Sequence, residues 1–71
     1  MATVLVLDDD AVIRGRAVGA LRGDGHVVIE CGTAPAAARV LDGRRFDLVL
    51  ANAAVAGEAA FAVLRRIRDR G

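Results

Sequence analysis

The sequence TVLVLDDDAV, residues 3–12, joins an aliphatic run to three consecutive carboxylates. An aliphatic run without polar alternation is typical of a strand that is covered on both faces of a parallel sheet. Neighbouring carboxylates repel one another, and in a partly dry site each raises the pKa of the others unless a cation, a donor or water offsets the repulsion. The sequence therefore predicts a buried strand over residues 4–7 that ends at a cation site, a helix cap, or both.

The composition indicates one small globular domain over residues 1–71. The chain is 55% hydrophobic and 27% charged, a balance that argues against disorder. A net charge of +1 predicts no direct binding to nucleic acid or to a membrane surface. The single cysteine, Cys31, excludes an internal disulfide and fits a reducing cytoplasm, where we expect it as a small core residue. No apolar run approaches the ~20 residues of a membrane span, and no signal peptide precedes the first strand.

The order of expected elements predicts an α/β fold. In chain order they are a strand at 4–7, a helix at 11–22, a strand at 27–29, a helix from Thr33 to about Leu41, a strand at 46–51 and a helix from about Glu58. The first helix is expected to bury Ile13, Ala17, Ala20 and Leu21, and the last helix to bury Phe61, Leu64 and Ile67. Asp10 and Thr33 are the expected N-caps. Strands that alternate with helices imply a three-layer fold, in which a parallel sheet with right-handed crossovers lies between helices.

Ligands of open parallel sheets bind beyond the carboxyl ends of the strands. The two expected central strands end at residues 8–10 and 51–57, so any site is expected there. A dinucleotide fold would place a glycine-rich turn after the first strand, where helix amides receive pyrophosphate. The acidic turn found here would repel phosphate, which argues against nucleotide binding.

Four segments, VLVLDDDAVIR, GHVVIE, FDLVL and FAVLRRIRDRG, follow one another along the chain. In this order and spacing they resemble the first part of a response-regulator receiver domain of two-component signalling. The resemblance extends over residues 1–71 and implies a partial flavodoxin-like fold with strand order 2-1-3. It also implies a truncated domain, since the fourth and fifth strand–helix units of the family are absent.

The resemblance also implies a degenerate phosphorylation pocket. Asp8 and Asp9 match the acidic pair that helps to hold Mg²⁺ in the family, and the backbone carbonyl of Ala54 is a further expected ligand. Asn52 stands at the position of the phosphoacceptor aspartate. Since an amide oxygen binds Mg²⁺ more weakly than a carboxylate does, we expect weak Mg²⁺ binding. The family's invariant lysine is also missing, because the chain contains no lysine.

A phosphoacceptor must be an anionic oxygen nucleophile, and Asn52 is a neutral amide. We therefore expect a receiver-like domain of a two-component phosphorelay that is not phosphorylated, is not an enzyme and acts by protein interaction in the cytoplasm. The expected partner is a sensor kinase, an output domain or a second copy bound at the edge of the third strand. Residues 48–50 are expected to form this open edge, and alternate side chains of residues 4–7 and 48–50 are expected to face water.

Other interpretations of these residues remain open. Asp8, Asp10 and Val12 also fit the D-x-D-x-[TV] pattern of haloacid-dehalogenase-like phosphatases, in which the first aspartate is the nucleophile and the second the general acid. A helix that starts at once leaves no room for the flap insertion of that family. Asp8 and Asp9 are alternatively solvated carboxylates near a helix dipole. Asn52 is alternatively a strand-end residue that bonds to nearby backbone.

Overall fold

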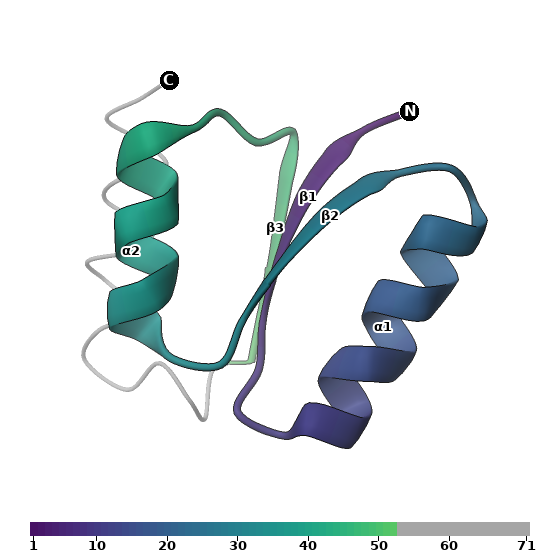
Figure 1. Ribbon diagram of the computed structural model, residues 1–71, viewed down its shortest axis with the longest axis horizontal. Coiled ribbons are helices and arrows are strands. Elements are labelled where there is room, and N and C mark those ends of the chain that lie inside the picture. Colours follow the sequence, from purple (N-terminus) through teal and green to yellow (C-terminus); the bar gives the residue numbers. More distant parts are fainter. Residues whose placement is uncertain (53–71) are drawn as a thin grey trace.

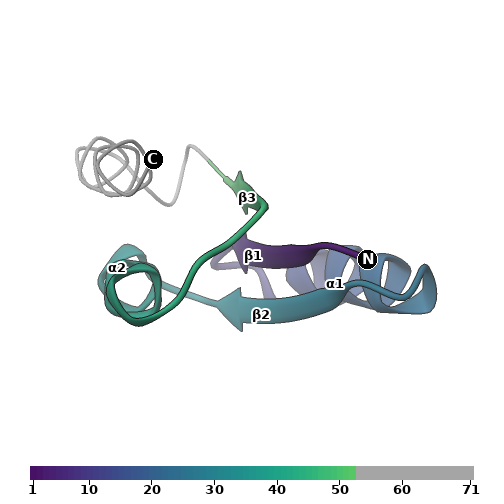
Figure 2. The same ribbon diagram turned by 90° about the horizontal axis from the view of Figure 1, so that it is seen from above.

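Within the described residues, three parallel strands form a sheet that carries one helix on each face (Figures 1 and 2). The computed structural model describes residues 1–52. Its elements are β1 (Thr3–Leu7), α1 (Ala11–Gly23), β2 (Val27–Cys31), α2 (Ala34–Gly43) and β3 (Leu48–Ala51). The strand order β2-β1-β3 confirms the predicted α/β fold and is consistent with a partial flavodoxin-like arrangement. The helix predicted from Glu58 lies outside the described residues.

The central strand, β1, is buried on both faces of the sheet. It pairs with β2 from Thr3 to Leu7 and with β3 from Val4 to Leu7. Its four aliphatic residues, 4–7, are at most 3% exposed. Successive side chains of a strand point to opposite faces, so this burial requires cover on both sides. The expectation that alternate side chains of residues 4–7 face water is therefore wrong, because α1 covers Val4 and Val6.

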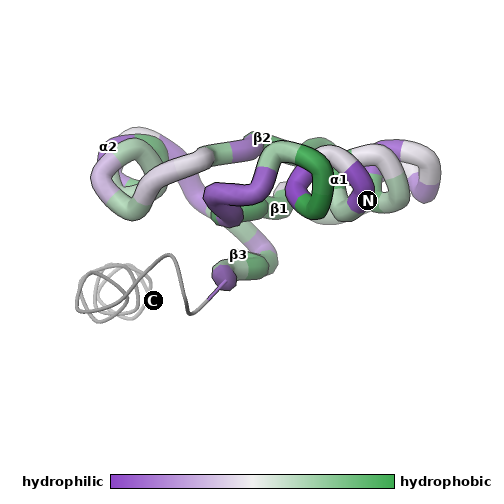
Figure 3. Tube along the Cα trace, turned by 90° about the horizontal axis from the view of Figure 1, so that it is seen from below, coloured by the Kyte–Doolittle hydropathy of each residue, from purple (hydrophilic) through white to green (hydrophobic). Residues whose placement is uncertain are grey.

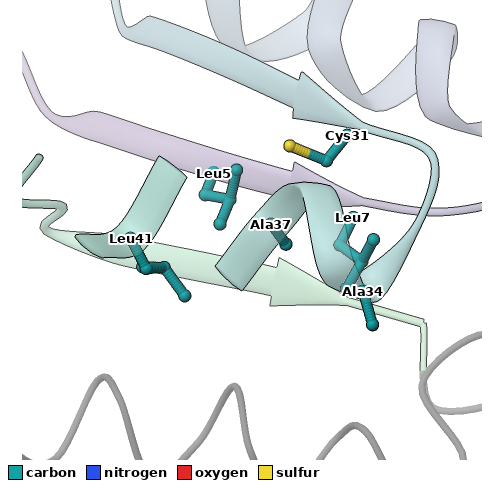
Figure 4. Packing of buried hydrophobic residues seen from close by; sticks show 6 residues of the cluster. All are labelled: Leu5, Leu7, Cys31, Ala34, Ala37 and Leu41. Carbon is teal, nitrogen blue, oxygen red and sulfur yellow. The ribbon is translucent and has the colours of Figure 1, made fainter. Parts of the chain in front are cut away.

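Each face of the sheet has its own hydrophobic cluster. On the α2 face, the buried residues are Leu5, Leu7, Cys31, Ala34, Ala37 and Leu41 (Figure 4). On the α1 face, they are Val4, Val6, Val18 and Val28. The small side chains of Ala34 and Ala37 let α2 approach the sheet closely. The α1 cluster is smaller, since Val18 is the one residue of α1 that is fully buried.

The buried face of α1 differs from the predicted one. Val18 is 3% exposed and Ile13 is 52% exposed. Ala17 and Leu21 pack against the α1-face cluster as expected, but Ala20 is exposed. The reason is the position of the helix, which lies beside β1 and β2 and leaves β3 uncovered on this face (Figure 2). The first turn of α1 therefore extends past the cluster.

Both predicted N-caps are present. The Asp10 carboxylate accepts hydrogen bonds from the N–H groups of Val12, at 2.9 Å, and Ile13, at 3.1 Å. The Thr33 hydroxyl accepts from the Ala36 N–H at 3.3 Å. These bonds satisfy backbone donors that have no partner inside a helix, which fixes where α1 and α2 begin.

The third strand begins at Leu48, two residues later than predicted. The N–H of Asp47 donates to the Thr3 carbonyl at 2.8 Å, and its carboxylate accepts from the Thr3 N–H at 2.7 Å. Because a side chain occupies the donor of Thr3, the regular ladder between β1 and β3 starts only at the next residue. Phe46 packs instead against the α2-face cluster.

The two helices offer a matched test of this packing. Leu41 is 2% exposed and Val12 is 64% exposed. We predict that Leu41→Ala lowers the free energy of unfolding by about 2–5 kcal/mol, because it leaves a cavity under α2. A loss of this size is comparable to the whole stability of many small domains, about 5 kcal/mol. Val12→Ala should change stability by less than about 0.5 kcal/mol. Urea unfolding followed by circular dichroism measures both, and equal losses would contradict the assignment of the core.

Candidate functional site

The carboxyl ends of β1 and β3 bring Asp8 and Asn52 together. Leu7 is paired with Ala51, and the Asn52 N–H donates to the Leu7 carbonyl at 2.9 Å. This ladder bond places the Asn52 side chain beside Asp8, and its Nδ2 donates to Asp8 Oδ1 at 3.4 Å. Two residues that are far apart in the sequence therefore form one polar site at this edge of the sheet.

Asp8 is buried and its carboxylate is hydrogen-bonded. The residue is 8% exposed, and besides Asn52 its Oδ1 accepts from the Asp10 N–H at 2.9 Å. Its backbone N–H donates to the Cys31 carbonyl at 3.1 Å, which extends the pairing of β1 with β2 by one residue. Asp8 is thus no solvated surface carboxylate. It is held at the end of the sheet by groups from three segments of the chain.

The other two carboxylates of the turn have different environments from Asp8. Asp9 is exposed to solvent, and the Asp10 side chain caps α1. The interpretation as solvated carboxylates therefore fits Asp9 and does not fit Asp8, which is buried.

Arg14 provides a positive charge at the acidic turn, a role that the sequence analysis did not assign. Its Nη1 donates to the Asp8 carbonyl at 2.7 Å, and its Nε lies 3.5 Å from Glu30 Oε1. A Cβ added at Gly32 would lie 3.2 Å from Arg14 Nη1, so the glycine leaves room for the guanidinium. The available signal was an arginine one turn after the cap Asp10, close to three aspartates.

A cavity of about 260 Å³ opens between α1 and the ends of β1 and β3. Its lining residues are Val6, Leu7, Asp8, Ile13, Arg14, Ala17, Leu50, Ala51 and Asn52. Asp8, Arg14 and Asn52 are its polar lining residues, and the other lining residues are aliphatic. The hydropathy view shows the same contrast between the hydrophilic turn after β1 and the hydrophobic residues of β3 (Figure 3).

Asn52 faces Asp8 through its amide NH₂ group. A carboxylate only accepts hydrogen bonds, so the Asn52 group that faces Asp8 is the amide NH₂, which cannot ligate a cation. The same Asp8 oxygen also accepts from Asp10. Across residues 1–52, no three His, Cys, Asp or Glu side chains lie close enough together to hold a metal ion. Ala54, the third expected ligand, lies outside the described residues.

Comparisons of the chain with models of protein families, with curated proteins and with solved structures found no match. Neither α1 nor α2, the helices of the described region, is long and apolar enough to cross a membrane. The chemistry of the polar site is therefore the basis for a functional assignment.

Cys31 lies next to this site and is a core residue. It is 6% exposed and belongs to the α2-face cluster. Burial raises the pKa of its thiol above the ordinary value, the nearby Arg14 charge lowers this pKa, and Glu30 raises it. Burial has the largest effect, so the thiol is neutral and poorly reactive at neutral pH.

The charge of Arg14 can be detected through Cys31. We predict that Arg14→Gln raises the pKa of the thiol further, because the thiolate loses a favourable positive charge. Arg16→Gln, an exposed change on the same helix, should leave this pKa unchanged. Titration of the thiolate absorbance measures both variants, with circular dichroism to verify the fold. A thiol pKa that is equal or lower in Arg14→Gln would contradict the arrangement.

The raised pKa of Cys31 also makes the stability of the fold depend on pH. Because the folded pKa lies above the unfolded one, the contribution of Cys31 to stability is complete below the unfolded pKa and is lost as the pH rises through the folded pKa. Arg14→Gln should therefore make the alkaline loss of stability larger.

Proposed function

We propose that this chain is a receiver-like domain of a two-component phosphorelay that has lost its acceptor and acts by protein interaction. The observation that carries the proposal is Asn52, which follows β3, lies beside the buried Asp8 and donates to its carboxylate. The strand order and the acidic turn after the central strand support the same assignment. Under this proposal, the arrangement corresponds to a phosphorylation pocket without its nucleophile.

The chemistry of Asn52 explains why phosphorylation is not expected. Attack on a phosphorus atom requires an anionic oxygen, and an amide is neutral. The Asn52 NH₂ group offsets the charge of Asp8 by donating a hydrogen bond, and the Arg14 guanidinium lies at the same turn. The charge of the pocket is therefore compensated by the chain itself. Mg²⁺ binding at Asp8 and Asp9 is accordingly weak.

The environments of Asp8 and Asp10 do not support the alternative hypothesis of a haloacid-dehalogenase-like phosphatase. A general acid at Asp10 would need a free carboxyl group, but its Oδ1 accepts two N–H groups at the start of α1, at 2.9 and 3.1 Å. A nucleophile at Asp8 would have to reach substrate from a side chain that is 8% exposed. The proposed role is therefore non-catalytic.

Exposed aliphatic side chains support a protein as the partner. Within residues 1–52, the large exposed ones beyond Met1 are Val12 at 64%, Ile13 at 52%, Leu48 at 47% and Leu50 at 41%. Ile13 and Leu50 line the same cavity, and exposed apolar groups that lie together are typical of interaction surfaces. The partner classes are a sensor kinase, an output domain or a second copy. The free thiol of Cys31 suits a cytoplasmic setting.

Acetyl phosphate tests the loss of the acceptor. We predict that incubation of the chain with acetyl phosphate and Mg²⁺ leaves its mass unchanged, because Asn52 cannot form an acyl phosphate. Intact mass spectrometry measures this directly. A gain of about 80 Da that hydroxylamine removes would contradict the proposal, since hydroxylamine cleaves acyl phosphates.

Substitution of Asn52 tests its role as a donor to Asp8. In Asn52→Asp the amide donor becomes a second carboxylate beside Asp8, so we predict lower stability in EDTA and a recovery when Mg²⁺ is added. The wild type should respond little to Mg²⁺. Asn52→Ala is the matched control, because it removes the donor without adding a charge and should not recover with Mg²⁺. Thermal unfolding of the three proteins, with and without Mg²⁺, measures these differences. Equal changes of the unfolding temperature on addition of Mg²⁺ would contradict the geometry of the pocket.

A further inference from the structure

We infer that the partner at the edge of β3 is a second copy of this chain, paired antiparallel so that two three-stranded sheets become one continuous sheet. The inference rests on the proposed function only in that the partner is a protein. It follows from the hydrogen-bonding groups, the apolar side chains and the charges at this edge, each of which selects the same arrangement.

The two edges of the sheet are not equivalent. In a strand, the backbone groups of successive residues point to opposite edges. The Val27 N–H and the Cys31 carbonyl bond to the β1 side, so the groups of Val28 and Glu30 point outward from β2. The outward Val28 carbonyl accepts from Arg22 Nη2 at 3.1 Å, and Glu30 adds a charge at this edge. Charged side chains of this kind protect an edge strand from further pairing.

The edge of β3 lacks such protection in the described part of the chain. The Asn52 N–H points toward β1, so the backbone groups of Val49 and Ala51 point outward. No strand within residues 1–52 pairs with them. A two-fold axis perpendicular to the sheet at Val49 would let the Val49 N–H of each copy donate to the Val49 carbonyl of the other. This is the close hydrogen-bonded pair of an antiparallel ladder.

The same register buries leucines. With Val49 opposite Val49, Leu48 lies opposite Leu50 of the second copy, on the same face of the sheet. These side chains are 47% and 41% exposed in the single chain. They lie on the α1 face, where α1 leaves β3 uncovered (Figure 2). A register shifted by one residue would place each leucine opposite a residue of the other face, so the leucines favour the Val49 register.

Charges select the antiparallel direction. Arg45 lies four residues before Val49, and Asp9 lies two residues after Leu7, which is paired with Ala51. Arg45 therefore lies before β3, at the amino end of the sheet, and Asp9 lies after β1, at its carboxyl end. In the antiparallel pair, Arg45 of one copy lies at the same end as Asp9 of the other. A parallel pair would bring like charges to the same end.

The expected dimer is weak. Each copy contributes a strand of four residues, which buries less than the roughly 1,200–2,000 Å² of a stable interface. Association should therefore depend on micromolar or higher concentration. High salt should weaken it, because the pairs between Arg45 and Asp9 are exposed to solvent.

Sedimentation equilibrium of the full chain in EDTA tests the inference. The wild type should show a monomer–dimer equilibrium over a concentration series up to about 1 mM. Arg45→Glu should weaken the dimer by about tenfold, because it replaces two symmetry-related attractions by repulsions. Arg39→Glu, the same charge change at an exposed position of α2, should change the dissociation constant by less than about twofold.

Charge exchange makes the test specific for the antiparallel pair. Asp9→Arg alone should weaken the dimer, and the double variant with Arg45→Glu should return to within about threefold of the wild type. A chain that stays monomeric throughout would overturn the inference, as would a double variant without recovery. Circular dichroism verifies that each variant is folded. Phosphorylation of the chain by acetyl phosphate would contradict the proposed function. It would leave the result of the sedimentation experiment unaffected.

Discussion

The aliphatic residues of β1 are at most 3% exposed, and this burial is possible only while a helix lies on each face of the sheet. A fully buried aliphatic side chain contributes about 1.5–3 kcal/mol, so four of them contribute an amount comparable to the whole stability of a small domain. Loss of either helix would expose half of these side chains. The sheet depends on the same strand, because within residues 1–52 β2 and β3 each pair with β1 and not with each other.

Local sequence patterns predicted the strands and helices of the fold. They did not predict which face of α1 is buried. An aliphatic run without polar alternation marked the central strand, and Asp10 and Thr33 marked the helix starts, because caps depend on adjacent residues. The buried face of α1 was predicted around Ile13, and the structure buries Val18 instead. Helical spacing shows which apolar residues share one side of a helix. Which of them are buried depends on where the helix lies on the sheet, and this is a property of the tertiary structure. The late start of β3 likewise depends on a bond between Asp47 and a distant strand.

Asp8 and Asn52 were predictable as members of the candidate site, whereas its hydrogen bonds and the contribution of Arg14 were not. Strand order placed Asp8 and Asn52 at one edge, and the structure describes them side by side. The sequence treated Asn52 as a weakened metal ligand, whereas it donates to Asp8, and only side-chain geometry distinguishes these roles. Arg14 was missed because its partners, Asp8 and Glu30, belong to other elements. The buried Asp8 carboxylate requires donors, and the Asp10 N–H and the Asn52 amide supply them.

The Asn52 amide and the Arg14 guanidinium, which lie at Asp8, bear on how the proposed domain could be regulated. A conformational switch needs a ligand that interacts differently with two states. A phosphoryl group and its cation would supply such a difference at a pocket of carboxylates. Under the proposed function, Asn52 removes both, so the charge of the pocket stays constant whatever the activity of a kinase. Asn52 directly follows β3, the strand whose edge is open. Contacts at that edge would therefore depend on the concentration of the chain and on salt, and not on phosphorylation.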